Sequence, residues 1–278
     1  MTEISAAMVK ELREATNVGM MECKKALQET GGDKAKAIQW LRERGLAIAE
    51  KKAGRAVKSG LIAADTFDGG RVGAMVEVNC ETDFVARNAN FQRFVRELLL
   101  KARDSDGDLT AALAPAVAAK VAEIGENIVF RRHLRMASQG AGAVGAYVHL
   151  GGKIGVLVEL GCQQAATTAQ PAFAELLRDL TLHIAACAPA ALDRASVPAA
   201  TAATERAIYA KQVEGKPAQI IEKIVAGKME KFYRQVCLTE QGFVKDPDIS
   251  VAALLEKTGK DLGDRLTIRR YARFVLGE

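Results

Sequence analysis

Two copies of one stretch decide the fold: Gly69-Gly70-Arg71-Val72-Gly73-Ala74-Met75-Val76-Glu77-Val78-Asn79-Cys80 and, 82 residues later, Gly151-Gly152-Lys153-Ile154-Gly155-Val156-Leu157-Val158-Glu159-Leu160-Gly161-Cys162. Without a gap, residues 69–100 match residues 151–182 at 10 of 32 positions. Self-similarity at a fixed spacing indicates a duplicated structural unit. The sequence therefore predicts two related subdomains.

Each copy predicts a strand followed by a helix. After the Gly-Gly turn, apolar residues alternate with period 2, which indicates a strand with one face on a core. They are Val72, Ala74, Val76 and Val78 in the first copy and Ile154, Val156, Val158 and Leu160 in the second. Farther on, Phe91, Phe94, Val95 and Leu98, and then Phe173, Leu176, Leu177 and Leu180, follow the helical spacing i, i+3, i+4, i+7. We expect an α+β fold in which helices cover two small antiparallel sheets.

Residues 1–45 predict a bundle of three short helices. Ser5 is placed to cap the first helix, Gly31-Gly32 ends the second, and Asp33 is placed to cap the third. The basic residues 46–58 are interpreted as a connecting segment.

The remaining segments predict a helical connection, an insertion and a last strand. Residues 111–135 are rich in alanine and predict a helix after Pro115 that joins the two copies. Residues 187–236 predict an antiparallel helical hairpin around Glu214-Gly215-Lys216-Pro217. Leu266, Ile268, Ala272 and Phe274 share one alternation that would complete the second sheet. The expected domains are 1–54, 55–140, 141–186 continued by 237–278, and the hairpin 187–236.

Composition excludes several classes of protein. The 278 residues are 49% apolar and 26% charged, which is typical of a globular chain. No apolar run approaches the roughly 20 residues that span a bilayer, and Glu3 interrupts any leader pattern. We therefore expect a cytoplasmic protein. The five cysteines lack Cys-x-x-Cys spacing and the three histidines stand alone, so we expect neither a disulfide framework nor a metal site.

The chain carries a net charge of +5, and residues 1–60 hold twelve Lys/Arg against eight Asp/Glu. This excess suits an acidic partner, either protein or RNA. The basic residues are interleaved with acidic ones, and Trp40 is the sole aromatic residue there, so a platform for stacking bases is missing. RNA binding is retained only as an alternative.

Residues 140–145, Gly140-Ala141-Gly142-Ala143-Val144-Gly145, spell GxGxxG, which would suit an NAD(P)-dependent enzyme. That site needs a strand before the motif and a helix after it. Here we expect the basic residues 131–135 to be helical and residues 146–149 to be extended. A linker is the favoured interpretation. The chain also lacks GxxxxGK[ST], and we expect no cofactor.

The segment after the strand differs between the copies. The first copy has Glu81-Thr82-Asp83-Phe84-Val85-Ala86-Arg87-Asn88 where the second has Gln163-Gln164-Ala165-Ala166-Thr167-Thr168-Ala169-Gln170. A charge beside a large aromatic residue in only one copy indicates an outside partner. The alternative is that Asp83 caps the next turn while Phe84 packs under the helix.

Met20 and Met21 pose a similar choice. We expect Met20 on the buried face of its helix, whereas Met21 shares a face with Lys24 and Lys25. An exposed methionine is often without function, but one beside two lysines also suits an apolar, acidic partner helix.

Three stretches resemble the elongation factor Ts family: Thr16-Asn17-Val18-Gly19-Met20-Met21-Glu22-Cys23-Lys24-Lys25-Ala26-Leu27, the Glu77–Asn88 region, and Ile124-Gly125-Glu126-Asn127-Ile128 with Arg131-Arg132. The resemblance implies a ubiquitin-associated-like (UBA-like) bundle, a duplicated core and an inserted coiled coil. It also implies a guanine nucleotide exchange factor, not an enzyme, whose partner is the GTPase elongation factor Tu. It favours the outside-partner reading of Asp83 and Phe84.

The resemblance also assigns residues. Thr82, Asp83, Phe84 and Val85 would dislodge Mg²⁺ from the partner GTPase. Further contacts would come from Arg13, Met20, Met21, Lys24, Lys52, Ile124, Gly125 and His149. For the hairpin stripe at Ile220, Ile224 and Phe232, the residues leave two interpretations open, namely weak homodimerisation or packing of the two hairpin helices against each other.

Overall fold

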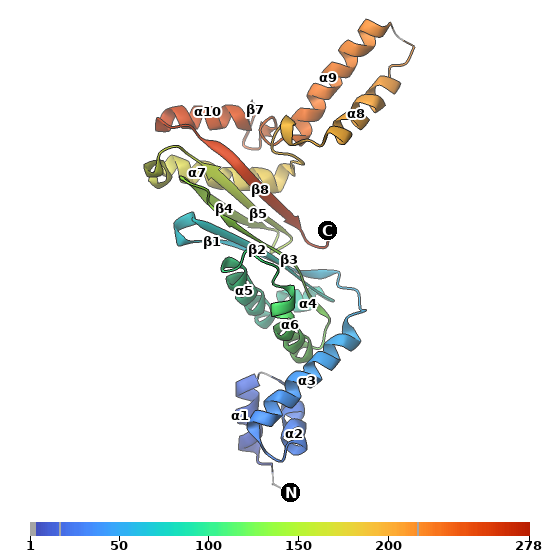
Figure 1. Cartoon of the computed structure of the whole chain (residues 1–278), viewed down its shortest axis with the longest axis vertical. Coiled ribbons are helices and arrows are strands. Elements are labelled where there is room, and N and C mark those ends of the chain that lie inside the picture. Colours follow the sequence, from blue (N-terminus) through green and yellow to red (C-terminus); the bar gives the residue numbers. More distant parts are fainter. Residues whose placement is uncertain (1–3, 17, 216) are drawn as a thin grey trace.

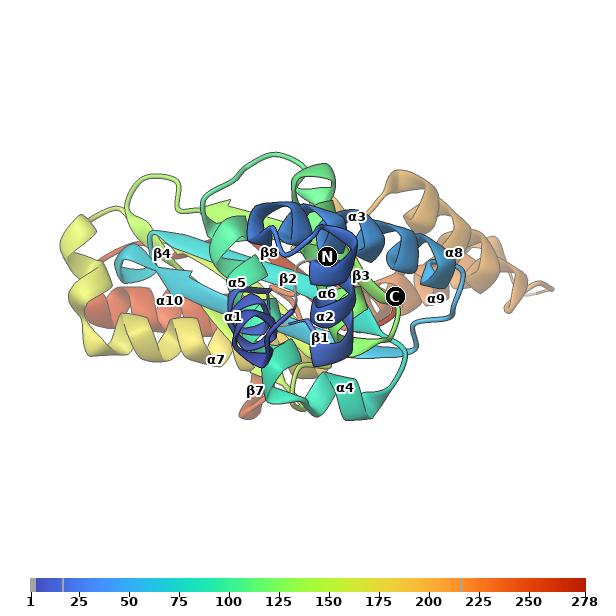
Figure 2. The same ribbon diagram turned by 90° about the horizontal axis from the view of Figure 1, so that it is seen from below.

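The computed structural model describes residues 4–16, 18–215 and 217–278, so Glu3, Asn17 and Lys216 lie outside the described residues. The molecule is elongated, with a helical bundle at one end, two sheets in the middle and a helical hairpin at the other end (Figure 1). Seen along the long axis, the hairpin extends to one side beyond the sheets (Figure 2). No described helix has the length and apolar character needed to cross a membrane.

The N-terminal bundle consists of α1 (Ala6–Thr16), α2 (Met20–Glu29) and α3 (Lys34–Lys52). Its caps are those predicted: Ser5 Oγ accepts the Met8 N–H at 3.3 Å, and Asp33 Oδ1 accepts the Lys36 N–H at 3.0 Å. The core of the bundle contains Val9, Leu12, Cys23, Ala26, Leu27, Ala37 and Leu41.

Helix α3 is longer than predicted, since it continues to Lys52 through the expected connecting segment. Ile48 and Ala49, on its second half, pack against the core of the first copy. This long-range burial supports a helix that local sequence alone does not predict. The connection to the first sheet therefore begins after Lys52.

The first copy is a three-stranded antiparallel sheet in the order β1-β2-β3, covered by two helices. Its elements are β1 (Ser59–Phe67), β2 (Val72–Cys80), α5 (Ala89–Arg103), α6 (Thr110–Ile124) and β3 (Ile128–Ala137). Two predictions were wrong here. The basic residues 131–135 lie in strand β3, and α6 packs on the first sheet through Leu113 and Val121 instead of joining the copies.

The second copy repeats this arrangement in the order β4-β5-β8. Its elements are β4 (Gly142–His149), β5 (Ile154–Gly161), α7 (Pro171–Cys187), α10 (Val251–Leu262) and β8 (Thr267–Val275), with the short strands β6 (Gly242–Phe243) and β7 (Asp246–Ser250) before α10. Leu266 and Ile268 face the helices, whereas Ala272 and Phe274 face the other sheet. The predicted single alternation was wrong, because the pairing with β5 shifts at a bulge that contains Arg269.

The two sheets pack face to face between two helical layers, so that β2 and β5 are buried on both sides (Figure 1). The intersheet core contains Ile62, Met75, Met136, Val144 and Leu157. Gly73 and Gly155 occupy equivalent positions, and a Cβ on either one would overlap side chains of the opposite sheet. These glycines allow the sheets to approach closely.

Arginine pairs at equivalent bulges bind a buried glutamate in each copy. In the first copy, Arg132 Nε donates to Glu77 Oε2 at 2.7 Å, and Arg131 is the bulged residue. In the second copy, Arg270 Nε donates to Glu159 Oε2 at 2.7 Å, and Arg269 adds a bond to Oε1 at 3.0 Å. The third strands therefore repeat at a spacing of 138 residues, which is longer than 82 because the hairpin interrupts the second copy.

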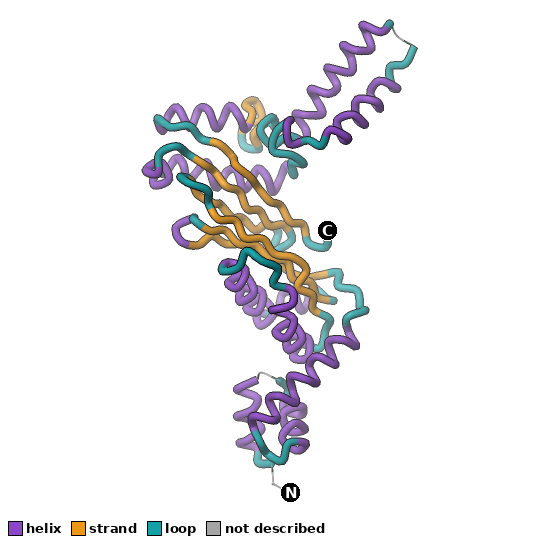
Figure 3. Tube along the Cα trace, in the orientation of Figure 1, coloured by secondary structure: helices purple, strands orange, loops and turns teal. Residues whose placement is uncertain are grey.

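The inserted hairpin consists of α8 (Ala199–Lys211) and α9 (Ala218–Val236), which project away from the sheets (Figure 3). Phe232, Met229 and Val225 are buried between its helices, and Ile224 packs against them. Ile220 is exposed. Most of the predicted stripe therefore serves to join the two helices.

Candidate partner-binding site

The exposed turn, residues 82–85, begins the one-turn helix α4 (Asp83–Arg87) that follows β2. Thr82 Oγ1 caps this helix by accepting the Val85 N–H at 3.3 Å. Val85 and Ala86 pack on the first core, whereas the Phe84 side chain is 82% exposed. The alternative in which Asp83 caps the turn and Phe84 packs beneath the helix is therefore wrong.

Asp83, the residue before Phe84, is exposed as well. Its carboxylate pairs with Arg87 at 3.1 Å, and both side chains are exposed. Such a pair contributes little to stability because water screens it. Asp83 can therefore exchange Arg87 for a donor on another molecule.

Glu126 holds the exposed turn from the neighbouring loop. Its Oε2 accepts the Thr82 N–H at 3.0 Å and its Oε1 accepts the Thr82 hydroxyl at 2.7 Å. Next to it, Glu81 Oε1 accepts the Asn127 N–H at 2.6 Å. Cys80 Sγ donates to the Thr82 carbonyl, and burial, with Glu126 adding to it, raises the pKa of this thiol to about 12. Hydrogen bonds made by residues 80, 81 and 82 thus fix the position of this segment.

The end of α3 and the residues after it are hydrogen-bonded to the loop that contains Glu126. Lys52 Nζ donates to the Gly125 carbonyl, and Asn127 Nδ2 donates to the Arg55 carbonyl at 2.8 Å. Gly125 ends α6 with φ +85° and is exposed, whereas Ile124 is half-buried on the first core. The structure therefore brings Lys52, Ile124 and Gly125 close to the exposed turn.

Four other candidate residues lie on the separate N-terminal bundle. Arg13, Met20, Met21 and Lys24 are all exposed. The expectation that Met20 is buried was wrong: it is the first residue of α2, beyond the packed part of the bundle, and it is 45% exposed. The bundle thus presents two methionines and a lysine on α2. Figure 1 shows α2 at the end of the molecule, apart from α4.

His149 ends strand β4 in the second copy, and its side chain is exposed. Its Nδ1 lies 2.8 Å from the Tyr147 hydroxyl. The following turn contacts the first sheet, since Gly152 O accepts the Ile62 N–H at 2.8 Å. His149 therefore lies at the junction of the two copies.

The second copy has the same turn without the aromatic residue. Gln164 occupies the cap position of the short helix η2 (Ala165–Ala169), and Asp264 takes the place of Glu126. Asp264 accepts the Gln163 and Gln164 N–H groups, each at 3.0 Å, and the Thr167 hydroxyl at 2.5 Å. The Thr167 bond and these two N–H bonds lower the pKa of Asp264 to about 2. The exposed positions carry Ala165 and Ala166.

Glu126 and Asp264 are the site-shaping residues that the sequence interpretation missed. Each is far along the chain from the turn it holds. The available signal is the spacing: Ile124-Gly125-Glu126 recurs as Leu262-Gly263-Asp264, 138 residues later. The two stretches align once the insertion in the second copy is taken into account.

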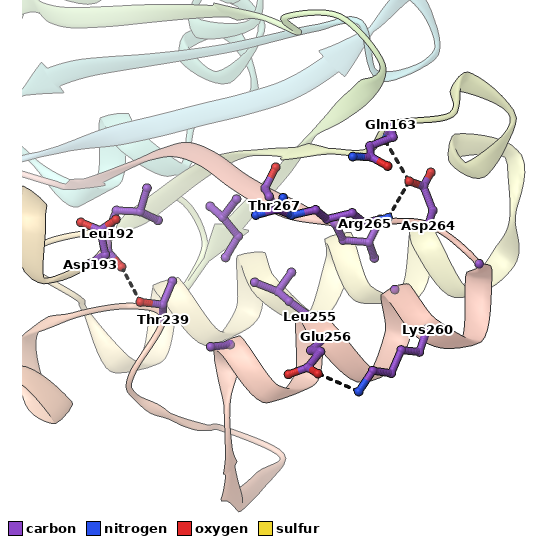
Figure 4. Close-up of a pocket in the computed structure, with 15 residues that line it drawn as sticks. Gln163, Leu192, Asp193, Thr239, Leu255, Glu256, Lys260, Asp264, Arg265 and Thr267 are labelled. Atoms are coloured by element: carbon purple, nitrogen blue, oxygen red, sulfur yellow. Dashed lines mark hydrogen bonds and ion pairs between the residues drawn. The ribbon is translucent and has the colours of Figure 1, made fainter.

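A cavity of about 600 Å³ lies between α10 and the start of β8 (Figure 4). Leu255, Leu266 and Ile268 line it, and Lys260 at its rim pairs with Glu256 at 2.7 Å. None of the predicted contact residues lines it. Within the described residues, no group of His, Cys, Asp or Glu is arranged to hold a metal ion. The cavity therefore adds no candidate to the site.

The GxGxxG stretch joins two strands, β3 before it and β4 from Gly142 onward. The expected helix before the motif was wrong. The rejection of a dinucleotide site still holds, because a strand instead of a helix N-terminus follows the glycines.

Comparison with known proteins places most of the chain in one family. A family model described as Elongation factor TS matches residues 81–278. A protein named Elongation factor Ts from Trichlorobacter lovleyi is 45% identical over 290 residues, covering 99% of this chain and 93% of its own length. Proteins of the same name from Nitratidesulfovibrio vulgaris (43% identical, covering 99% of this chain and 96% of their own length) and Symbiobacterium thermophilum (45%, 100% and 93%) are similarly close.

The duplicated α+β core with its bundle and hairpin is thus that of a translation elongation factor. The chain belongs to the elongation factor Ts family. The resemblance found in the sequence is confirmed.

Proposed function

We propose that this protein is a non-catalytic exchange factor that binds elongation factor Tu and accelerates the release of GDP from it. The observation that carries the proposal is Phe84, a ring that is 82% exposed on a turn held by Glu126. A large aromatic side chain presented to solvent on a fixed turn suits insertion into a pocket of a partner.

The proposed mechanism requires no covalent chemistry. A GTPase holds GDP through Mg²⁺ and through backbone amides that cradle the phosphates. Insertion of Phe84 displaces elements that support the metal, while Asp83 pairs with a donor on the partner and fixes the approach. Because the coupling is reciprocal, GDP weakens the binding of the factor by the same ratio by which the factor weakens the binding of GDP.

The bundle provides a second point of attachment. Met21 is 75% exposed and lies on α2 with Met20 and Lys24. Flexible thioethers beside a positive charge suit an apolar helix that carries acidic residues. Arg13 adds charge there, and His149 contacts the partner at the junction of the two copies. Lys52 acts through the Gly125 loop, because its ammonium group is bound to that carbonyl.

The exposed turn is tested by Phe84→Ala in stopped-flow measurements of fluorescent GDP leaving elongation factor Tu. A central aromatic contact is worth at least about 2 kcal/mol, so release should slow roughly 30-fold at a saturating concentration of the factor. Leu100→Ala, which trims another exposed apolar residue of the same copy, is the matched control. Unchanged release with Phe84→Ala would refute the role of the ring.

Two further predictions follow from this function. The protein acts in the cytoplasm, where translation takes place, and it needs no cofactor of its own. Weak homodimerisation through the hairpin also stays a prediction, and it now rests on the exposed Ile220. Sedimentation of the wild type and Ile220→Lys tests it, since a dimer using this face should dissociate in the variant.

A further inference from the structure

Leu150 combines an unfavourable backbone with an exposed side chain. It begins the β4–β5 turn with φ +51°, in the left-handed region, and it is 65% exposed. The left-handed region disfavours residues with a Cβ, and leucine gains no local hydrogen bond there. Among the described residues, Leu150 joins no buried apolar cluster. Leucine at this position therefore makes no contact in the described structure that would offset the backbone strain.

The first copy shows which residue the turn itself favours. The equivalent turn is Asp68-Gly69-Gly70, with φ values of +54°, +63° and +84°, against +51°, +64° and +95° for Leu150-Gly151-Gly152. Aspartate tolerates the left-handed region because its short polar side chain bonds to the nearby backbone. The same conformation thus carries a compatible residue in one copy and a strained leucine in the other.

The Leu150 turn lies against the part of the first copy that supports Phe84. Gly152 O accepts the Ile62 N–H at 2.8 Å, and Gly152 packs directly on the Leu61 side chain. Leu61 belongs to the same core as Val85 and Ala86 of α4. Helix α4 also contacts β1, so β1 is the strand that both the Leu150 turn and α4 pack against.

We propose that Leu150 is a second apolar contact for the partner, contributed by the second copy to the surface that Phe84 forms on the first. This inference rests on the proposed function, because the occupant is the same GTPase. Strain at an exposed residue is retained where it serves binding. Leu150 thus extends the contact surface across the junction of the two copies.

Three variants test the inference. Leu150→Asn relieves the backbone and removes the apolar side chain, whereas Leu150→Met keeps the apolar area. Asp68→Asn places asparagine at the equivalent position of the first copy, where no apolar side chain is lost. Leu150→Asn should raise the thermal midpoint by roughly 2–4 °C and weaken binding to elongation factor Tu about tenfold in titration calorimetry. Leu150→Met and Asp68→Asn should bind like the wild type.

The outcomes separate this inference from the proposed function. Wild-type affinity in Leu150→Asn overturns the inference, as does equal weakening in Leu150→Met. If the wild type accelerates GDP release and Phe84→Ala slows it, the proposed function stands in either case. If the wild type neither binds elongation factor Tu nor accelerates release, both ideas are overturned.

Discussion

Glu77 and Gly277, which lie 200 positions apart in the chain, are joined by a 2.8 Å hydrogen bond from the glycine N–H to the buried carboxylate. The equivalent bond runs in the other direction between the copies: Glu159 of the second copy accepts the Gln139 N–H at 2.6 Å. The arginines also bond across the copies, since Arg132 donates to the Val275 carbonyl and Arg270 donates to the Ala137 carbonyl. Each copy thus completes the polar network of the other.

Breaking one half of this network should destabilise the whole core. Glu77→Gln leaves arginine charge facing a neutral amide in a fully buried position, and we expect a loss of about 2–4 kcal/mol in the free energy of unfolding. Urea denaturation measures it. Glu256→Gln, which removes the exposed Lys260 pair, should leave the unfolding midpoint close to that of the wild type. Equal midpoints for both variants would contradict a stabilising role for the network.

Glu126 should act on exchange more than on stability. Glu126→Gln cannot accept both bonds from Thr82, so the exposed turn loosens. A lost bond of about 1 kcal/mol predicts roughly fivefold slower GDP release, measured with fluorescent nucleotide. Asp264→Asn loosens the matching turn that lacks the aromatic residue, and it should leave release unchanged. Equal slowing by both variants would mean that the effect is general, not positional.

Any side chain at Gly155, where the two sheets meet, should destabilise the protein. An alanine Cβ at Gly155 would lie 2.6 Å from Met75 Sδ and also overlap Ile62, so we expect Gly155→Ala to cost about 1–3 kcal/mol. Gly227 has nothing within 4 Å of an added Cβ and lies inside α9. Gly227→Ala should therefore stabilise the protein by up to about 1 kcal/mol. Thermal unfolding of both variants checks the opposite signs.

His183 should make the fold sensitive to acid. It is buried, its Nδ1 accepts the Val244 N–H at 3.1 Å, and its Nε2 bonds to Gln241 Oε1 at 3.0 Å. Burial lowers the pKa of this imidazole below 6.5 despite the Gln241 bond.

As the pH falls below about 6.5, the unfolded chain takes up this proton before the folded one, and stability is lost until the folded pKa is reached. The wild type should lose more unfolding free energy between pH 7.5 and pH 5 than His183→Gln does. Parallel pH profiles for the two proteins would exclude His183 as the cause.

The repeated strands and helices were predictable because their periodicity is local. Val76 and Val78 alternate along β2, and Phe91 and Val95 recur along α5, so the buried face of each element can be identified from a few neighbouring residues. The exposure of Phe84 was suggested by comparing the copies, because the second has Ala166 at that position. Most of the core residues could thus be predicted, because they belong to such short-range patterns.

The missed features depend on contacts between distant segments. Strand β3 resembles a basic helix because Arg132 points to a glutamate of another strand and Arg131 occupies a bulge. The length of α3 depends on packing against the first copy, and the role of Glu126 depends on Thr82, 44 residues earlier. No window of local sequence contains both partners of these contacts.

The hairpin leaves and rejoins the second copy at one point, where Ala191 and Cys237 form a parallel bridge and the Ala190 N–H bonds to the Val236 carbonyl. Because the two ends meet, adding or removing a matched turn in both helices would change the reach of this arm by about 5.4 Å. The sheets would not need to adjust. The hairpin can thus become longer or shorter without moving α4 or the Phe84 ring.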